Sequence, residues 1–200
     1  KFNMDIKGPG AGIITIVIIV AWLASGLFIV KPTEQAVVKR FGKVVKVVGS
    51  GPNYHIPYPI ETVDKAEVTK VHRLEIGFRT TRAGVKTLPQ EALMLTGDEN
   101  IVSIDLSVQY KITNISDYLY NVHDVEGTIM DVAESSIREV AGREKIDDIL
   151  TVGKNRIQIE TQKEIQGILD RYGAGIRITA VQLQDVEPPQ EVVNAFKDVA

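Results

Sequence analysis

The segment that most constrains the fold is an uninterrupted apolar run at residues 13–30, IITIVIIVAWLASGLFIV. Its charge-free limits are Gly8 and Val30, so that 23 residues lie between Lys7 and Lys31. A helix of this length rises about 35 Å at about 1.5 Å per residue, which exceeds a hydrocarbon core of about 30 Å. The run therefore predicts a transmembrane helix over residues 8–30.

Two other interpretations of this run are a buried core helix and a cleaved signal peptide. A helix packed on a soluble core normally carries a polar stripe, which this run lacks. The small residues at 24–26 suit a signal-peptide cleavage site. However, the apolar run continues past them to Val30. The pattern therefore favours a membrane-spanning segment.

The charge balance of the remaining chain argues against a nucleic-acid partner. Residues 31–200 contain 21 basic and 25 acidic side chains, a net charge of −4, whereas phosphate binding requires a concentrated basic face. The sequence has no cysteine, so it offers no disulfide, thiolate nucleophile or cysteine metal ligand. Basic residues gather just after the apolar run, and the positive-inside rule alone would place the following residues in the cytoplasm.

Residues 31–92 have the composition of short strands separated by turns. Two valine-rich runs, 35–41 and 44–48, flank Gly42 and predict a hairpin. Glycines and prolines then interrupt regular structure at 49–60, a segment that either packs as a loop or touches lipid headgroups. Residues 61–78 predict one or two strands. The polar segment 80–90 predicts a mobile loop.

Residues 102–112 show strict alternation of apolar and polar side chains. Six apolar positions in a period of two predict a strand with one buried and one solvated face. The polar residues 97–100 before it predict a turn that pairs this strand with residues 93–96.

Helical periodicity follows. It predicts a short helix at 117–122, a longer one that Asp124 caps and that ends near Gly142, a turn at 147–150, and a helix at 152–172. Residues 176–186 predict a strand, and the paired prolines 188–189 suit the first turn of another helix.

This order predicts an α+β fold. We expect a single N-terminal transmembrane helix at 8–30, a membrane-proximal β-rich subdomain at 31–92 and an α+β subdomain at 93–187. We expect residues 188–200 to begin a long helix that continues beyond Ala200, because its apolar face is unfinished.

The sequence predicts no catalytic residue, no cofactor-binding residue and no metal ligand. Three histidines lack the paired spacing of a metal site: His55, His72 and His123. The sharpest enzymatic alternative is a Ser-Lys hydrolase, with Ser135 or Ser136 facing Lys145. These serines lie in a helical pattern without a strained elbow or glycine-lined oxyanion donors, which disfavours it.

Acidic residues cluster between positions 134 and 148, and basic residues stand near them at helical spacings. The acidic set is Glu134, Glu139, Glu144, Asp147 and Asp148, and the basic set is Arg138, Arg143 and Lys145. The simplest interpretation is a solvated helix face with internal ion pairs. The alternative is a ladder of charges between subunits, which would set register and partner choice.

Five motifs lie in a fixed order along nearly the whole chain: EQAVVKRFGK at 34–43, GPNYHIP at 51–57, MLTGDENIV at 94–102, VQYKI at 108–112 and VEPPQEV at 186–192. With the leading anchor they resemble the prohibitin-homology (SPFH or band 7) superfamily of stomatin, flotillin and prohibitin, and most closely a branch from the bacterial inner membrane. The chain departs from this pattern in its longer segment at 80–90 and in its short stretch after the paired prolines.

The resemblance implies a membrane-anchored scaffold without a cofactor rather than an enzyme. Members of that branch assemble with an HflC-like subunit into hetero-oligomeric rings or cages, and they enclose and modulate the FtsH-like AAA+ protease. The resemblance also implies that the soluble part lies in the periplasm. This placement conflicts with the positive-inside rule, which by the charge count above would put the same residues in the cytoplasm. A stomatin-like organiser of membrane microdomains remains an alternative, as does the membrane-tethered hydrolase.

Overall fold

The structure, a computed structural model, describes residues 9–150 and 153–188. The chain divides into two compact units, Lys1–Val68 (unit 1) and Thr69–Ala200 (unit 2). The sequence pattern predicts the boundary between two subdomains after residue 92 instead. The earlier division follows from strand pairing, because β6 (His72–Ile76) is hydrogen-bonded to β10 (Ile101–Ile112), the central strand of unit 2.

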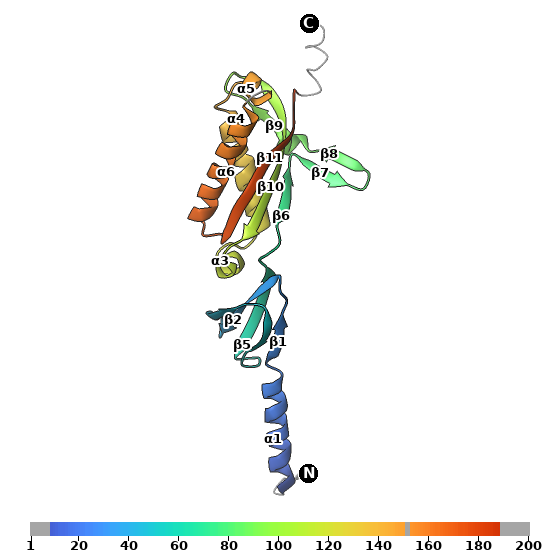
Figure 1. Ribbon diagram of the computed structural model, residues 1–200, viewed down its shortest axis with the longest axis vertical. Helices are drawn as coiled ribbons and strands as arrows, with labels where there is room; N and C mark the ends of the chain where they lie inside the picture. The colour runs from blue at the N-terminus through green and yellow to red at the C-terminus, as the bar shows by residue number, and fades with distance from the viewer. Residues whose placement is uncertain (1–8, 151–152, 189–200) are drawn as a thin grey trace, which may run out of the picture. The chain divides into compact units, whose positions relative to one another are not determined.

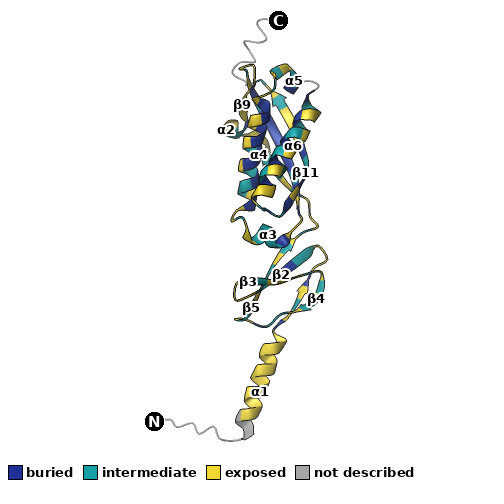
Figure 2. Cartoon of the chain, turned by 90° about the vertical axis from the view of Figure 1, so that its left-hand side faces the viewer, coloured by how far each residue is buried: buried dark blue, intermediate teal, exposed yellow. Residues whose placement is uncertain are grey.

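The apolar run forms two elements rather than one. Helix α1 (Pro9–Ala24) is exposed along its described length, as Figure 2 shows, and strand β1 (Leu27–Val30) follows it. The prediction of a helix reaching Val30 is therefore wrong at its C-terminal end, and residue 8 lies outside the described residues. Within residues 9–150 and 153–188, no helix combines the length and the apolar character needed to cross a bilayer.

Gly26 explains why the helix ends early. The Gly26 carbonyl accepts a hydrogen bond of 3.0 Å from the backbone N–H of His55. A Cβ atom at position 26 would lie 2.1 Å from the His55 carbonyl oxygen, so only glycine permits this approach. β1 then pairs antiparallel with β4 (Gly51–Tyr54). A long-range backbone contact thus diverts the last apolar residues from the helix into a sheet.

A second small sheet completes unit 1, with the order β3-β2-β5. Its strands are β2 (Glu34–Arg40), β3 (Lys43–Val48) and β5 (Glu61–Glu67), which confirms the hairpin predicted at Gly42. The Glu61 carboxylate is buried beside it and accepts hydrogen bonds from the Ile56 N–H (2.7 Å) and the Arg40 guanidinium (2.8 Å). Burial alone would raise the pKa of Glu61, but these partners outweigh it and lower that pKa.

Unit 2 is built on a sheet in the order β11-β10-β6, with β9 (Leu93–Leu95) also paired to β10. β11 (Ile176–Glu187) lies antiparallel to β10 along most of its length. The predicted strand at 102–112 and the hairpin before it are both confirmed. The apolar side of β10 packs into the core. The side predicted to be solvated is partly buried, since Asp105 is 6% exposed and Ser107 is 0% exposed.

Helices cover the apolar face of this sheet (Figure 1), which confirms the predicted α+β class. They are α4 (Val125–Ala141), α5 (Ile146–Leu150) and α6 (Lys154–Arg171), whereas α3 (Ile115–Tyr120) lies at the end of the sheet. Asp124 caps α4 as predicted, with its Oδ1 accepting a 3.0 Å hydrogen bond from the Gly127 N–H. The predicted start of α6 at residue 152 lies outside the described residues, as do residues 189–200 of the predicted last helix.

Glutamines on α6 satisfy the outer backbone groups of β11, which is an edge strand among the described residues. Gln166 accepts from the Ile178 N–H (2.8 Å) and donates to the Ile176 carbonyl (3.2 Å). Gln162 donates to the Ile178 carbonyl, and Gln158 accepts from another N–H of the same strand. Occupied edge groups cannot pair with a foreign strand, so this ladder protects the edge from aggregation.

The segment predicted as a mobile loop at 80–90 is regular structure, so that prediction is wrong. β7 (Phe78–Thr81) and β8 (Gly84–Thr87) form a hairpin, and α2 (Pro89–Ala92) follows. Gly84 supplies the positive φ of 126° that this tight turn needs. Figure 1 shows the hairpin extending away from the sheet of unit 2. We call residues 78–87 the arm.

Candidate interaction surfaces

The structure keeps the three histidines apart. His55 Nδ1 lies 2.8 Å from the Ile56 carbonyl oxygen in unit 1. His72 stacks on Tyr110 in unit 2, with ring centroids 5.0 Å apart, and His123 lies between α3 and α4. Within the part of the chain that the structure describes, no three His, Asp or Glu side chains converge to hold a metal ion.

The serines of the hydrolase hypothesis lie inside α4. The Ser135 hydroxyl donates to the Val132 carbonyl at 3.0 Å, an ordinary bond within a helix. Ser136 is 1% exposed, and its hydroxyl packs in the core without a hydrogen-bond partner among the described residues. Lys145 follows the end of the helix. Neither serine offers the accessible, activated hydroxyl that nucleophilic catalysis requires.

The acidic and basic residues near the end of α4 pair as predicted. Glu134 and Arg138 approach to 2.5 Å, and Glu139 pairs with Arg143 one turn further along. Glu144 instead reaches Arg156 at the start of α6. The Glu139–Arg143 pair is exposed on both sides, and in the other two pairs the arginine is about half-exposed, so solvent screening keeps the contribution of these pairs to stability small. Their partners lie within the subunit, which matches the interpretation as a solvated helix face.

Aromatic side chains gather where α1 joins the strands of unit 1. The Trp22 indole N–H donates to the Tyr58 carbonyl at 3.0 Å, and Tyr58 itself is 76% exposed. Phe41 is 79% exposed, and its N–H bonds to the carbonyl of Ile60. Phe41 also has a φ of 49°, an unusual conformation for a bulky residue. Exposed aromatic rings at the end of an apolar helix are typical of a membrane–water interface.

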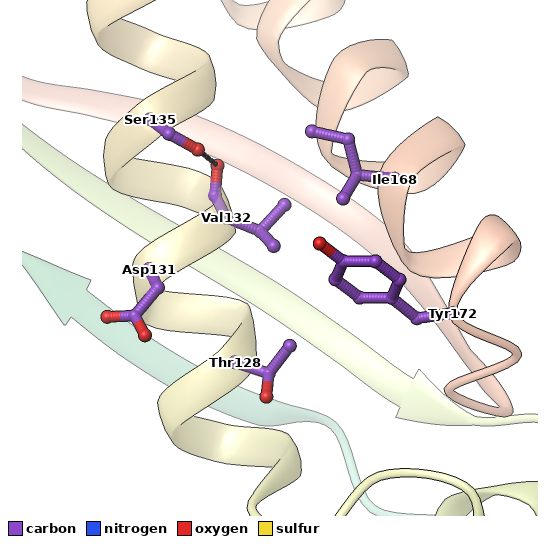
Figure 3. A pocket seen from close by; sticks show the side chains of 6 residues that line it. All are labelled: Thr128, Asp131, Val132, Ser135, Ile168 and Tyr172. Atoms are coloured by element: carbon purple, nitrogen blue, oxygen red, sulfur yellow. Dashed lines mark hydrogen bonds between the residues drawn. The ribbon is translucent and has the colours of Figure 1, made fainter.

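A shallow groove of about 310 Å³ runs between α4 and α6 (Figure 3). Its lining residues are Thr128, Asp131, Val132, Ser135, Ile168 and Tyr172. Figure 3 shows Ile168 and Tyr172 pointing across it toward α4. Its described lining holds one carboxylate and hydroxyl groups but no histidine or lysine, and the Ser135 hydroxyl donates to a backbone carbonyl, so the groove has the character of a contact surface rather than a reaction site.

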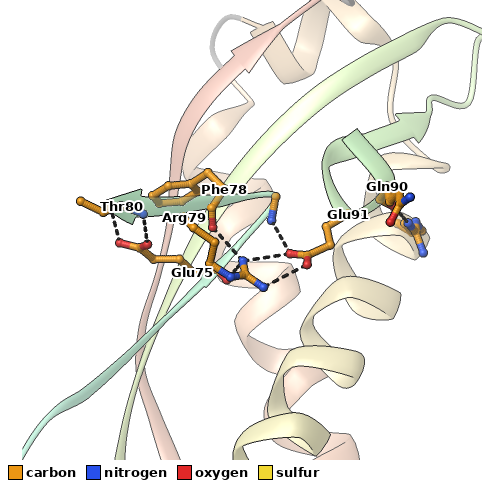
Figure 4. Close-up of polar contacts among 8 residues, drawn as sticks. Glu75, Phe78, Arg79, Thr80, Gln90 and Glu91 are labelled. Carbon is orange, nitrogen blue, oxygen red and sulfur yellow. Dashed lines mark hydrogen bonds and ion pairs between the residues drawn. The ribbon is translucent and has the colours of Figure 1, made fainter. Parts of the chain in front are cut away.

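A polar cluster fixes the arm where it leaves the sheet (Figure 4). The Arg79 guanidinium donates to both carboxylate oxygens of Glu91 on α2, at 2.9 and 3.0 Å. Glu91 also accepts from the Gly77 N–H at 3.1 Å. On the other side, the Thr80 N–H and hydroxyl each donate to Glu75 at 2.8 Å. We call this cluster the arm root; it holds the central residues of the hairpin's first strand, Arg79 and Thr80, in place from two sides.

An acidic notch of about 90 Å³ lies on the face of β10 opposite the helices. Its lining residues are Thr87, Ser103, Asp105, Asp185 and Glu187. Burial, reinforced by the charges of Asp185 and Glu187, raises the pKa of Asp105 from 3.8 to about 6. Among the described residues, no cation pairs with these three carboxylates, and Asp105 Oδ1 has no hydrogen-bond partner. The sequence pattern does not predict the notch, because an aspartate on the polar side of an alternating strand is expected to be solvated.

Comparison with known proteins identifies the family. Residues 28–200 match the family described as SPFH domain / Band 7 family. The chain belongs to the SPFH (band 7) family. The match includes the strands of unit 1 and the sheet and helices of unit 2, so both units are parts of the SPFH fold. The resemblance drawn from the five motifs is confirmed.

Two similar curated proteins are named HflK. The chain is 38% identical over 201 residues to Protein HflK of Treponema pallidum, covering 97% of this chain and 60% of that protein. It is 33% identical over 199 residues to Modulator of FtsH protease HflK of Escherichia coli, covering 96% of this chain and 44% of that protein. The chain therefore spans about half the length of these relatives.

Proposed function

We propose that this chain belongs to a membrane-anchored, oligomeric scaffold that modulates a FtsH-like AAA+ protease. The name of the Escherichia coli relative, a modulator of FtsH protease, supports the link to that protease. The observation that carries the membrane part is α1, whose apolar side chains remain uncovered: Ile14 is 61% and Ile18 is 62% exposed. Apolar surface of this extent requires a lipid or protein cover.

In this proposal, α1 (Pro9–Ala24) anchors the chain in the bacterial inner membrane as a single pass. Residues 31–92 form the membrane-proximal part, where Phe41 and Tyr58 lie among the headgroups together with Trp22. Residues 93–187 form the α+β subdomain, and residues 188–200 begin the long helix that the sequence predicts. The soluble part lies in the periplasm.

The scaffold assembles with an HflC-like subunit into a hetero-oligomer that encloses the protease. A single chain of this kind offers no reaction site among its described residues, but many copies side by side would restrict the access of membrane substrates to an enclosed enzyme. The role is therefore one of controlling access rather than of catalysis. The buried Ser136 gives no support to the hydrolase alternative.

The experiment that tests this proposal is the mass of the full-length protein after gentle solubilisation. The protein is expressed with and without the HflC-like subunit and the FtsH-like protease. A very large complex that requires the related subunit and retains the protease supports the scaffold. A monomer or small oligomer whose mass is unchanged by the HflC-like subunit and the FtsH-like protease would refute the scaffold. A stomatin-like organiser of lipid would then fit better.

A further inference from the structure

A break in strand register builds the acidic notch. The pairing of β10 with β11 shifts between Ile104 and Leu106, where one residue of β10, Asp105, faces two residues of β11. A bulge of this kind re-aims the side chains beside it. Asp185, within the bulge, and Glu187, at the end of β11, line the same notch as Asp105. The sheet itself therefore holds three carboxylates at one place.

Asp105 is buried without a hydrogen-bond donor from its own chain. It is 6% exposed, and its Oδ1 has no partner among the described residues. The Gly77 backbone packs against it, since a Cβ at position 77 would lie 2.8 Å from Oδ1. Yet the Gly77 N–H donates to Glu91 instead. A buried carboxylate without a donor is costly, so its presence points to a donor from outside the chain.

The rest of the lining also lacks a donor of positive charge. Within residues 9–150 and 153–188, neither Asp185 nor Glu187 takes part in an ion pair, and no lysine or arginine lines the notch. The hydroxyl groups of Thr87 and Ser103 add two further acceptors at the rim. The notch thus presents hydrogen-bond acceptors from three strands and suits a cationic ligand with several donors.

The size and form of the notch favour a guanidinium group. About 90 Å³ accommodates a small head group. A guanidinium is planar and carries five N–H donors in a fixed fork, which can reach carboxylates on two neighbouring strands, whereas an ammonium carries its three donors on one atom. Leu93 is directly opposite Ser103 in the sheet and is 39% exposed, so it offers apolar contact for the methylene groups next to a guanidinium.

We propose that the acidic notch is a binding site for a guanidinium group, which is held between Asp105, Asp185 and Glu187. The group has two possible sources, an arginine side chain of the HflC-like subunit and a free organic cation that carries the same group. With the first source, the inference rests on the proposed scaffold and names a contact within it. The site itself belongs to this chain alone and can be measured without the partner.

A titration of the full-length chain in nanodiscs, without other subunits, tests the site. The probe is N-acetyl-arginine amide, and its uncharged counterpart is N-acetyl-citrulline amide; saturation-transfer NMR measures the binding of each. The arginine probe should bind at least about tenfold more tightly than the citrulline probe, and D105N and D185N should each weaken it by about tenfold. E99Q is the matched control, because Glu99 is an exposed carboxylate outside the notch; it should bind like the unmodified chain. Equal binding of both probes, or unchanged binding in D105N, would overturn the inference.

The same titration on the complex with the HflC-like subunit identifies the source. If an arginine of that subunit fills the notch, the complex should not bind the probe, and D105N should weaken association of the two subunits by about tenfold. If the source is a free cation, the complex should bind the probe as the isolated chain does, and D105N should assemble normally. Either result supports the site. If no complex forms although the isolated chain binds the probe, the scaffold is rejected and the site stands.

Discussion

Replacing Asp105 by asparagine should stabilise the folded chain at neutral pH. The folded-state pKa of Asp105 is raised to about 6 from 3.8, so ionised Asp105 opposes folding. The stabilising contribution of the protonated form is complete below about pH 4 and is lost as the pH rises through 6. This difference in pKa corresponds to about 3 kcal/mol at most. Water at the mouth of the notch reduces it, and we expect about 1–2 kcal/mol for D105N.

The assay is denaturant unfolding of the solubilised full-length protein, followed by circular dichroism under conditions that dissociate the subunits. D105N should be more stable than the unmodified protein at pH 7.5 and equally stable at pH 4. D185N is the control: it removes one neighbouring charge and keeps Asp105, so it should give a smaller gain. A loss of stability at pH 7.5, or the same gain at both pH values, would refute the reasoning about the notch.

Three further predictions concern single side chains. Q166L removes two hydrogen-bond partners of the β11 backbone. It should lower the unfolding free energy by about 2–4 kcal/mol, measured by urea titration. A loss below about 1 kcal/mol would contradict the role of Gln166 at the edge strand. E91A frees Arg79 at the arm root and should speed tryptic cleavage at Arg82 by about tenfold, with cleavage elsewhere unchanged. Glu61 has a lowered pKa, so its stabilising effect is fully present above pH 4.5 and is lost as the pH falls through the folded-state pKa; E61Q should be less stable than the unmodified protein at pH 7, and the difference should shrink only in acid below pH 4.5.

The sequence correctly predicted the secondary-structure elements that nearby residues determine. The strand at 102–112 follows from a side-chain period of two, and its core side is buried along its length. The start of α4 follows from Asp124, whose carboxylate bonds to a backbone N–H three residues later. The family could also be recognised from the sequence, because its motifs are spread along nearly the whole chain.

The errors arose where a distant residue decides the structure. The helix expected at 8–30 ends early because Gly26 meets the backbone of His55. The expected loop at 80–90 is an ordered arm because Glu91 and Glu75 bind its first strand from separate elements. The acidic notch combines the start of β10 with the end of β11, two segments about 80 positions apart in sequence. Only strand register brings them together.

The most direct test of the proposed role is the rate at which the FtsH-like protease degrades a membrane-embedded substrate. Pulse-chase measurements compare cells that contain the full-length protein with cells that lack it, and with cells that produce it without α1, residues 9–24. We predict that loss of the protein changes the degradation rate and that only the anchored form restores it. Equal rates in all three strains, with the protease present at equal levels, would contradict the assignment as a membrane-anchored modulator.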